Sequence, residues 1–225
     1  MSTQKPELHF FHGFLGDPCD WDPLRSHLTG YHSFSHDILE IPALKKPSIL
    51  IGYSMGGRAI LQTYRANIQH VKGMVFLSSN LGTSSLKDKK TRKHEEGLWI
   101  EKSQQEGIDS FIKWWYEKPL FAPFKASPFY HQVEARRRKN THSTIVNQLN
   151  RFSLARTENW WEKISEITIP LYFLFGEHDT KYDRIYKKCC SLPKACIPKS
   201  GHVLHLEAPA ECAHNIKQFV EVNYD

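Results

Sequence analysis

The sequence Gly52-Tyr53-Ser54-Met55-Gly56 (GYSMG) has the form G-x-S-x-G and follows the apolar run Ser48–Ile51 directly. A stretch with helical spacing begins at Met55. Between a strand and a helix, a serine in this pattern lies on a sharp turn that exposes its hydroxyl. Small flanking residues are needed because the helix packs closely behind the turn. We therefore predict that Ser54 is the reactive residue of an enzyme site.

A reactive serine needs a histidine to accept its proton and a carboxylate to orient that histidine. Position in the chain selects among the 13 histidines. His202 follows a short strand-like run and precedes a final helix, whereas Asp179 lies just past the strand-like Ile169–Phe175. The order serine, aspartate, histidine is typical of this kind of site. Asp179 is the predicted orienting carboxylate, with Glu177 and Asp183 as alternatives.

The glycine-containing loop His12–Gly16 follows the first apolar run, Leu8–Phe11. A loop at this place supplies one backbone N–H to an oxyanion hole, and the residue after the serine supplies the other. We therefore predict that the amides of Phe14 and Met55 form an oxyanion hole.

Short apolar runs alternate with turn signals in the first third of the chain, and strand-like runs return near its end. This repetition predicts an α/β fold with a mostly parallel sheet and helices on both faces. Between these parts, charged residues and tryptophans replace the strand-like runs, and amphipathic helices are expected at Ser110–Glu117 and Ser143–Ala155. We expect a core formed by residues 1–85 and 167–225, with a helical cap insertion at residues 86–166.

Composition excludes several classes of protein. The 225 residues are 40% hydrophobic, which argues against disorder, and no apolar run approaches the roughly 20 residues of a membrane span. The N-terminus lacks the apolar segment of a signal peptide. Five scattered cysteines fit reduced thiols, and the adjacent Cys189 and Cys190 are predicted to be structural. We expect a cytoplasmic monomer or homodimer without membrane contact.

The net charge of +6 is concentrated in two runs, Lys87–Lys93 and Arg136–Lys139. No zinc-finger, homeodomain or RNP-type motif accompanies them, so no nucleic-acid partner is expected. His202 and His205 are spaced like metal ligands, but no third ligand has a suitable spacing. The sequence therefore predicts no metal site, and its basic charge fits an anionic small molecule as well as nucleic acid or anionic lipid.

Together these residues resemble the α/β-hydrolase superfamily over nearly the whole chain. Within it, the chain is similar to the MenH family, the menaquinone-pathway synthases that form 2-succinyl-6-hydroxy-2,4-cyclohexadiene-1-carboxylate. The narrower match rests on several segments: HGFLG with Asp20-Trp21, GYSMGGR, Arg92, Trp99, WYEKPLF (115–121), Arg136 with Asn140, GEHDTKY and GHVLHLEAP.

The resemblance implies a lyase that eliminates pyruvate from 2-succinyl-5-enolpyruvyl-6-hydroxy-3-cyclohexene-1-carboxylate. Ser54, activated by His202 and Asp179, would be the base, and no cofactor would be needed. Arginine suits such a substrate because its planar fork binds carboxylates through two donors. The implied substrate-binding residues are Tyr53, Arg58, Arg92, Trp115 and Arg136. Because Arg136 lies in a basic run, Arg137 or Arg138 is an alternative to it.

The chain departs from this family in two places. It begins at what should be the third strand, and only residues 38–47 stand where relatives have a loop and a whole helix. Ten extended residues at ~3.3 Å each still span one neighbouring strand. We therefore expect a sheet trimmed at the N-terminal hairpin and at the first crossover helix, with one face partly uncovered.

Three other functions compete with the lyase. A carboxylesterase or thioesterase would use Ser54 as a covalent nucleophile and would have no use for several pocket arginines. A non-catalytic α/β-hydrolase-like binding protein would fit the missing crossover helix but not an intact triad. Nucleic-acid binding through the two basic runs would show steep salt dependence.

Overall fold

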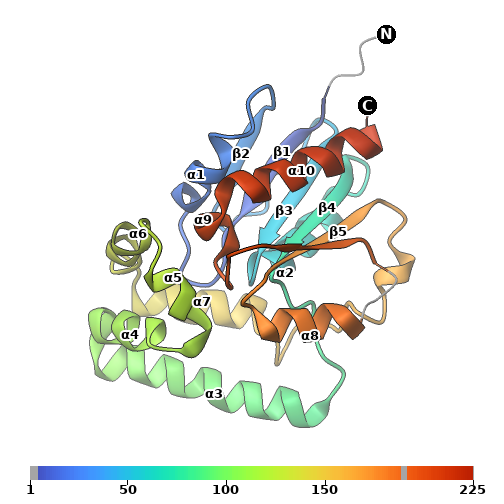
Figure 1. Ribbon diagram of the computed structural model, residues 1–225. Coiled ribbons are helices and arrows are strands. Elements are labelled where there is room, and N and C mark those ends of the chain that lie inside the picture. The colour runs from blue at the N-terminus through green and yellow to red at the C-terminus, as the bar shows by residue number, and fades with distance from the viewer. Residues whose placement is uncertain (1–4, 189–191, 225) are drawn as a thin grey trace.

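The computed structural model describes residues 5–188 and 192–224, and within them one sheet of six parallel strands forms the core (Figure 1). The central strands β3 and β4 are almost continuously apolar and buried, which is typical of a parallel sheet covered on both faces. The strand order is β2-β1-β3-β4-β5-β6. The strands are β1 (Glu7–Phe11), β2 (Ser33–His36), β3 (Ser48–Tyr53), β4 (Val71–Leu77), β5 (Leu171–Gly176) and β6 (Lys194–Ile197).

Helices cover both faces of this sheet, as the sequence predicts. Figure 1 shows α10 across the front of the sheet and α2 behind it. The elements of the core are η1 (Pro18–Trp21), α1 (Asp22–Arg25), α2 (Gly56–Ala66), α8 (Thr180–Lys188), α9 (Leu204–Glu207) and α10 (Pro209–Tyr224). Cys189 and Cys190, predicted to be structural, lie outside the described residues.

A run of helices separates β4 from β5 and lies beyond the carboxyl ends of the strands (Figure 1). The helices expected at 110–117 and 143–155 correspond to α4 and α7. None of the helices in the described part of the chain is both long and apolar enough to cross a membrane. The run consists of α3 (Leu86–Gln105), α4 (Gly107–Tyr116), η2 (Pro119–Phe121), α5 (Ala122–Lys125), α6 (Tyr130–Arg137), α7 (His142–Phe152) and η3 (Ile164–Glu166).

The connection from β2 to β3 crosses β1 without any helix, as expected from its length. The buried side chains of Ile38 and Leu44 attach this segment to the core. Asn67, just after α2, accepts a hydrogen bond from the Leu44 amide (2.9 Å) and donates one to the Pro42 carbonyl (3.1 Å). These polar bonds and buried apolar contacts hold an irregular crossover where a helix would otherwise pack.

The start of α2 tests how tightly the core is packed. A Cβ on Gly56 would lie 2.2 Å from the carbonyl oxygen of Phe11, and a Cβ on Gly97, inside α3, would meet nothing within 4 Å. We expect Gly56→Ala to lower the free energy of unfolding by about 1–3 kcal/mol. Gly97→Ala should raise it by about 0.5–1 kcal/mol, because alanine favours a helix. Urea unfolding measures both, and equal effects would contradict the close approach at Gly56.

Candidate active site

Ser54 occupies the turn between β3 and α2 in a strained conformation. Its φ is +51°, a left-handed value that residues other than glycine seldom adopt. The Ser54 amide donates to the Leu77 carbonyl (2.8 Å), which fixes the turn to the neighbouring strand. A Cβ on Gly52 would lie 2.5 Å from the carbonyl oxygen of Gly56, so the two ends of the turn touch through their backbones. The small residues predicted around the serine are therefore required by this close approach.

His202 and Asp179 complete a hydrogen-bonded chain with Ser54. The Nε2 atom of His202 lies 3.2 Å from Ser54 Oγ, and its Nδ1 lies 2.8 Å from Asp179 Oδ2. The Tyr182 ring stacks on the imidazole at a centroid distance of 5.1 Å. The imidazole is thus held between the hydroxyl and the carboxylate in the orientation that proton transfer from serine requires.

Burial and hydrogen bonding set the protonation of this chain. Burial alone would raise the pKa of Asp179, but hydrogen bonds from His202 and Ser78 outweigh it and hold that pKa below its ordinary value. Burial lowers the pKa of His202, although its bond to Asp179 opposes the shift. At neutral pH the site therefore contains a neutral imidazole beside an ionised carboxylate, which is the form that accepts a proton.

The alternative acids and the second histidine have other partners. Glu177 accepts a hydrogen bond from the Lys199 amide (2.8 Å), and Asp183 forms an ion pair with Lys187 (2.7 Å). His205 turns into the core, where its ring packs against Trp21 and Tyr53, and burial lowers its pKa to about 3. Among the described residues, no three histidine, cysteine or acidic side chains are grouped to hold a metal ion.

The amides of Phe14 and Met55, predicted to form an oxyanion hole, flank the serine. Both residues line the same pocket as Ser54. Neither amide donates to any other residue in the described part of the chain. Two backbone donors beside a reactive hydroxyl suit negative charge that develops on a carbonyl oxygen.

The pocket at Ser54 has a volume of about 90 Å³ and is rich in positive charge. Among the described residues, four cationic side chains and no acidic ones line it. Four of the five predicted substrate-binding residues are on its wall: Tyr53, Arg58, Arg92 and Trp115. The fifth, Arg136, is not.

Arg137, rather than Arg136, reaches the pocket from the end of α6. Both guanidinium groups bind the buried carboxylate of Asp20, Arg136 through its Nη2 (2.7 Å) and Arg137 through both terminal nitrogens. Successive residues on a helix point about 100° apart, and of these two only Arg137 lines the pocket. The assignment of Arg136 is thus corrected by one residue, to an alternative that the sequence left open.

The other two arginines are held by different partners. Arg58 is buried, and it donates to the carbonyls of Phe152 (2.6 Å) and Asn80 (2.8 Å), while burial lowers its pKa to about 10. Arg92 donates to Glu96 (2.6 Å) and lies over the Trp99 ring at 4.3 Å. Each guanidinium is oriented before any ligand arrives, which lowers the entropic cost of binding.

Sequence reasoning missed several pocket residues, above all Lys181 and Tyr182. Both directly follow Asp179 and Thr180 at the start of α8. The segment GEHDTKY contained the signal, because a helix that begins beside Asp179 brings its first turn to the same pocket. Further residues on the wall are Tyr116, Leu120, Phe121, Leu154 and Val203.

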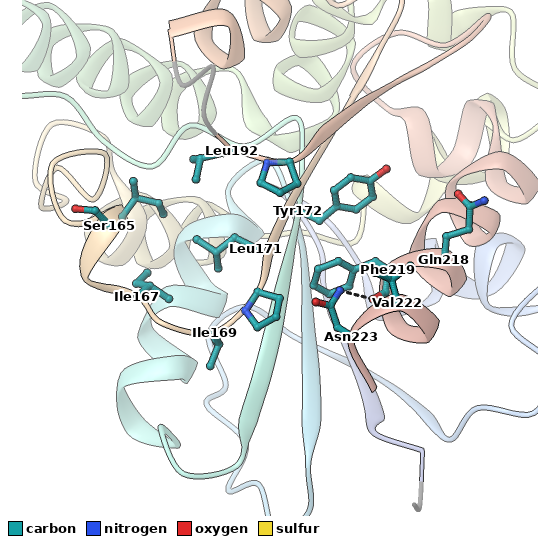
Figure 2. Close-up of a pocket in the computed structure, with 13 residues that line it drawn as sticks. Ser165, Ile167, Ile169, Leu171, Tyr172, Leu192, Gln218, Phe219, Val222 and Asn223 are labelled. Atoms are coloured by element: carbon teal, nitrogen blue, oxygen red, sulfur yellow. Dashed lines mark hydrogen bonds between the residues drawn. The ribbon is translucent and has the colours of Figure 1, made fainter. Parts of the chain in front are cut away.

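A second pocket, of about 570 Å³, lies away from these groups at the amino ends of β5 and β6 (Figure 2). Figure 2 shows apolar side chains such as Ile169, Leu171 and Phe219 around it, with α10 on one side. No charged side chain of the described residues lines it. Its place and chemistry separate it from the site at Ser54.

Several known proteins resemble this chain in sequence or in fold. The 2-succinyl-6-hydroxy-2,4-cyclohexadiene-1-carboxylate synthase of Salmonella heidelberg (strain SL476) is 25% identical over 243 residues, covering 96% of this chain and 94% of its own. The structure of MenH from S. aureus matches with a TM-score of 0.88 at 23% identity, covering all of this chain and 96% of that one. A thermophilic esterase from Thermogutta terrifontis matches with a TM-score of 0.78 at 16% identity, covering 98% and 91%.

The family model described as the alpha/beta hydrolase family matches residues 10–215. That range contains the turn at Ser54 together with His202 and Asp179, which complete its hydrogen-bonded chain. It also contains all six strands, apart from the first residues of β1. This chain belongs to the alpha/beta hydrolase family.

Proposed function

We propose that the protein is a carbon–oxygen lyase that eliminates pyruvate from 2-succinyl-5-enolpyruvyl-6-hydroxy-3-cyclohexene-1-carboxylate, a step of menaquinone biosynthesis. The observation that carries the proposal is the positive pocket beside a complete serine–histidine–aspartate arrangement. The substrate has three carboxylates, and the pocket presents cations without acidic neighbours on its wall. The name of the Salmonella relative supports the same reaction.

The proposed reaction begins with proton removal from the ring carbon that carries the succinyl group. His202 accepts the Ser54 proton as Ser54 Oγ takes the ring proton, and Asp179 stabilises the imidazolium that forms. The electron pair forms a ring double bond, the existing double bond shifts by one position, and the carbon–oxygen bond to the enolpyruvyl group breaks. Pyruvate leaves as its enolate and is protonated, so the ring becomes the cyclohexadiene.

Charge develops mainly on the succinyl carbonyl oxygen during this step. The amides of Phe14 and Met55 are suited to bind that oxygen, because both lie beside Ser54 and have no other partner among the described residues. Removing one such donor typically costs about 3–4 kcal/mol of transition-state stabilisation. Arg58, Arg92 and Arg137 would bind the carboxylates, and Tyr53 and Trp115 would form the apolar wall against the ring.

Ester hydrolysis is the second candidate, favoured by the geometry of the triad itself. The same Ser54–His202 contact would serve a covalent nucleophile, with an acyl-enzyme in place of proton abstraction from carbon. The pocket cations favour elimination, since a simple uncharged ester gains nothing from them.

Replacement of Ser54 tests the proposal directly. Ser54→Ala should reduce pyruvate release from the freshly made precursor by at least about a thousandfold, because the residue that takes the proton is lost. Product binding, followed by tryptophan fluorescence, should stay within a few-fold of wild type. Ser85→Ala, which removes the hydroxyl that caps α3 away from the pocket, is the control. Pyruvate release by Ser54→Ala at the wild-type rate would exclude the proposal.

The pH dependence of kcat/KM reports the protonation of His202. Because the neutral imidazole is active and burial lowers its pKa, activity should fall only as the pH drops below about 6.5. Asp179→Asn removes the carboxylate that raises the pKa of His202. The decline of kcat/KM on the acid side should therefore move to lower pH, and the maximal kcat/KM should decrease. An acid limb centred above pH 7 in the wild type would contradict the predicted protonation state.

Three consecutive arginines test the position of α6. Arg137→Gln should reduce kcat/KM by about tenfold to a hundredfold, the value of a hydrogen bond to a charged group. Arg138→Gln should leave it unchanged, since the partners of Arg138 among the described residues are Glu134 and Asp109 on the surface. The kcat/KM of Arg136→Gln should lie between those of the other two variants, because Arg136 binds Asp20 but does not line the pocket. A larger loss for Arg136→Gln than for Arg137→Gln would reverse the correction made above.

A further inference from the structure

The pocket at Ser54 adjoins a larger cleft that none of the predicted catalytic groups lines. The cleft has a volume of about 570 Å³ and lies between α3, α8 and the loop that follows β4. Three residues line both spaces: Arg92, Leu154 and Lys181. The two spaces are therefore neighbouring compartments with one shared wall.

The catalytic compartment alone is too small for the proposed substrate. Sites for ligands of this size usually enclose about 300–1,000 Å³. The compartment at Ser54 encloses about 90 Å³, whereas the adjoining cleft encloses about 570 Å³. A substrate with its reacting carbons at Ser54 therefore extends beyond this compartment, and the cleft is the adjoining space that shares its wall.

Lys181 lies at the boundary between the two compartments, and its charge is not paired with any described acidic residue. Its side chain is exposed, and its ammonium group forms no ion pair or hydrogen bond with any described residue. The group lies over the Tyr182 ring, 5.5 Å from its centroid. Arg92, by contrast, is already bound to Glu96 (2.6 Å) and lies 3.9 Å from Glu95. Lys181 is thus the cation on the shared wall that is free to take an anion.

Among the described residues, the charged side chains that line the cleft are three cations, Arg92, Lys181 and Lys188, and two carboxylates, Asp88 and Glu95, of which Glu95 lies beside Arg92. Burial first, and then the charges of Arg92 and Lys181, lower the pKa of Lys118 to about 8. The charge of Lys181 also acts on His202, adding to the effect of burial on its pKa. The Lys118 ammonium lies 3.9 Å from the ring centroid of Trp115, and it is Trp115 that lines the pocket. Several cations that disfavour one another's charge are stabilised when an anion binds among them.

We infer that the cleft is a second compartment of the substrate site and that Lys181 binds the carboxylate of the substrate's succinyl arm there. The inference rests on the proposed function. With the succinyl carbonyl at the amides of Phe14 and Met55, the rest of that arm points away from the reacting carbons. This arm stays on the product, so the same contact would hold the product after pyruvate has left. Lys181 is a specificity-determining residue in this account, since it touches no reacting atom.

The experiment compares two lysines of α8. Lys181→Gln should raise both the KM of the precursor and the product inhibition constant about tenfold, with a smaller change in kcat. Lys187→Gln removes the same charge from the same helix, but Lys187 is paired with Asp183 (2.7 Å) and does not line the cleft. Its constants should stay within twofold of wild type.

A chemically modified ligand shows whether the lysine meets that carboxylate. Product with the succinyl carboxylate blocked as a methyl ester should bind wild type and Lys181→Gln equally weakly. The inference would be overturned if Lys181→Gln lowered the affinity for the free acid and for the ester by the same factor. Unchanged constants in Lys181→Gln would overturn it too. Failure of the proposed function would give a different result, because the wild-type protein itself would then release no pyruvate from the precursor.

Discussion

The close approach of α2 to the sheet is the constraint on which the site depends. Gly56 leaves no room for a side chain against the Phe11 carbonyl, and Gly52 leaves none against Gly56. Because the helix starts so near the strands, the chain must turn sharply at Ser54 and take a positive φ there. The turn costs of order 1–3 kcal/mol, which the buried strands β3 and β4 absorb. Its result is a serine hydroxyl fixed at the carboxyl edge of the sheet.

Everything else in the site is arranged around that fixed hydroxyl. The loops after β5 and β6 bring Asp179 and His202 to it, and the helices between β4 and β5 bring Arg92 and Arg137. Asp20 joins these two parts, because its buried carboxylate in the core binds Arg137 from α6. Removing such a carboxylate would leave a buried guanidinium without its partner, which is costly. The pocket charge and the attachment of the helical segment are therefore linked.

The sequence predicted the parallel sheet and placed Ser54, Asp179 and His202 correctly relative to strands, since buried strands and tight glycine turns leave strong local patterns. It misplaced one arginine because three identical residues, 136–138, carry no signal for which of them faces inward. That choice depends on how α6 packs against the core, where Asp20, distant in sequence, binds both Arg136 and Arg137. Lys181 escaped notice for a similar reason: its importance comes from two cavities that meet beside it.

The central claim is that this arrangement performs elimination on an anionic substrate rather than ester hydrolysis. The most direct test is the ratio of kcat/KM for the menaquinone precursor to that for a short uncharged ester, measured with one wild-type preparation. The cationic pocket predicts a ratio of at least about a thousand, since ion pairs to several carboxylates contribute only with the precursor. A ratio below one would contradict the account and make the protein an esterase with an unused positive pocket.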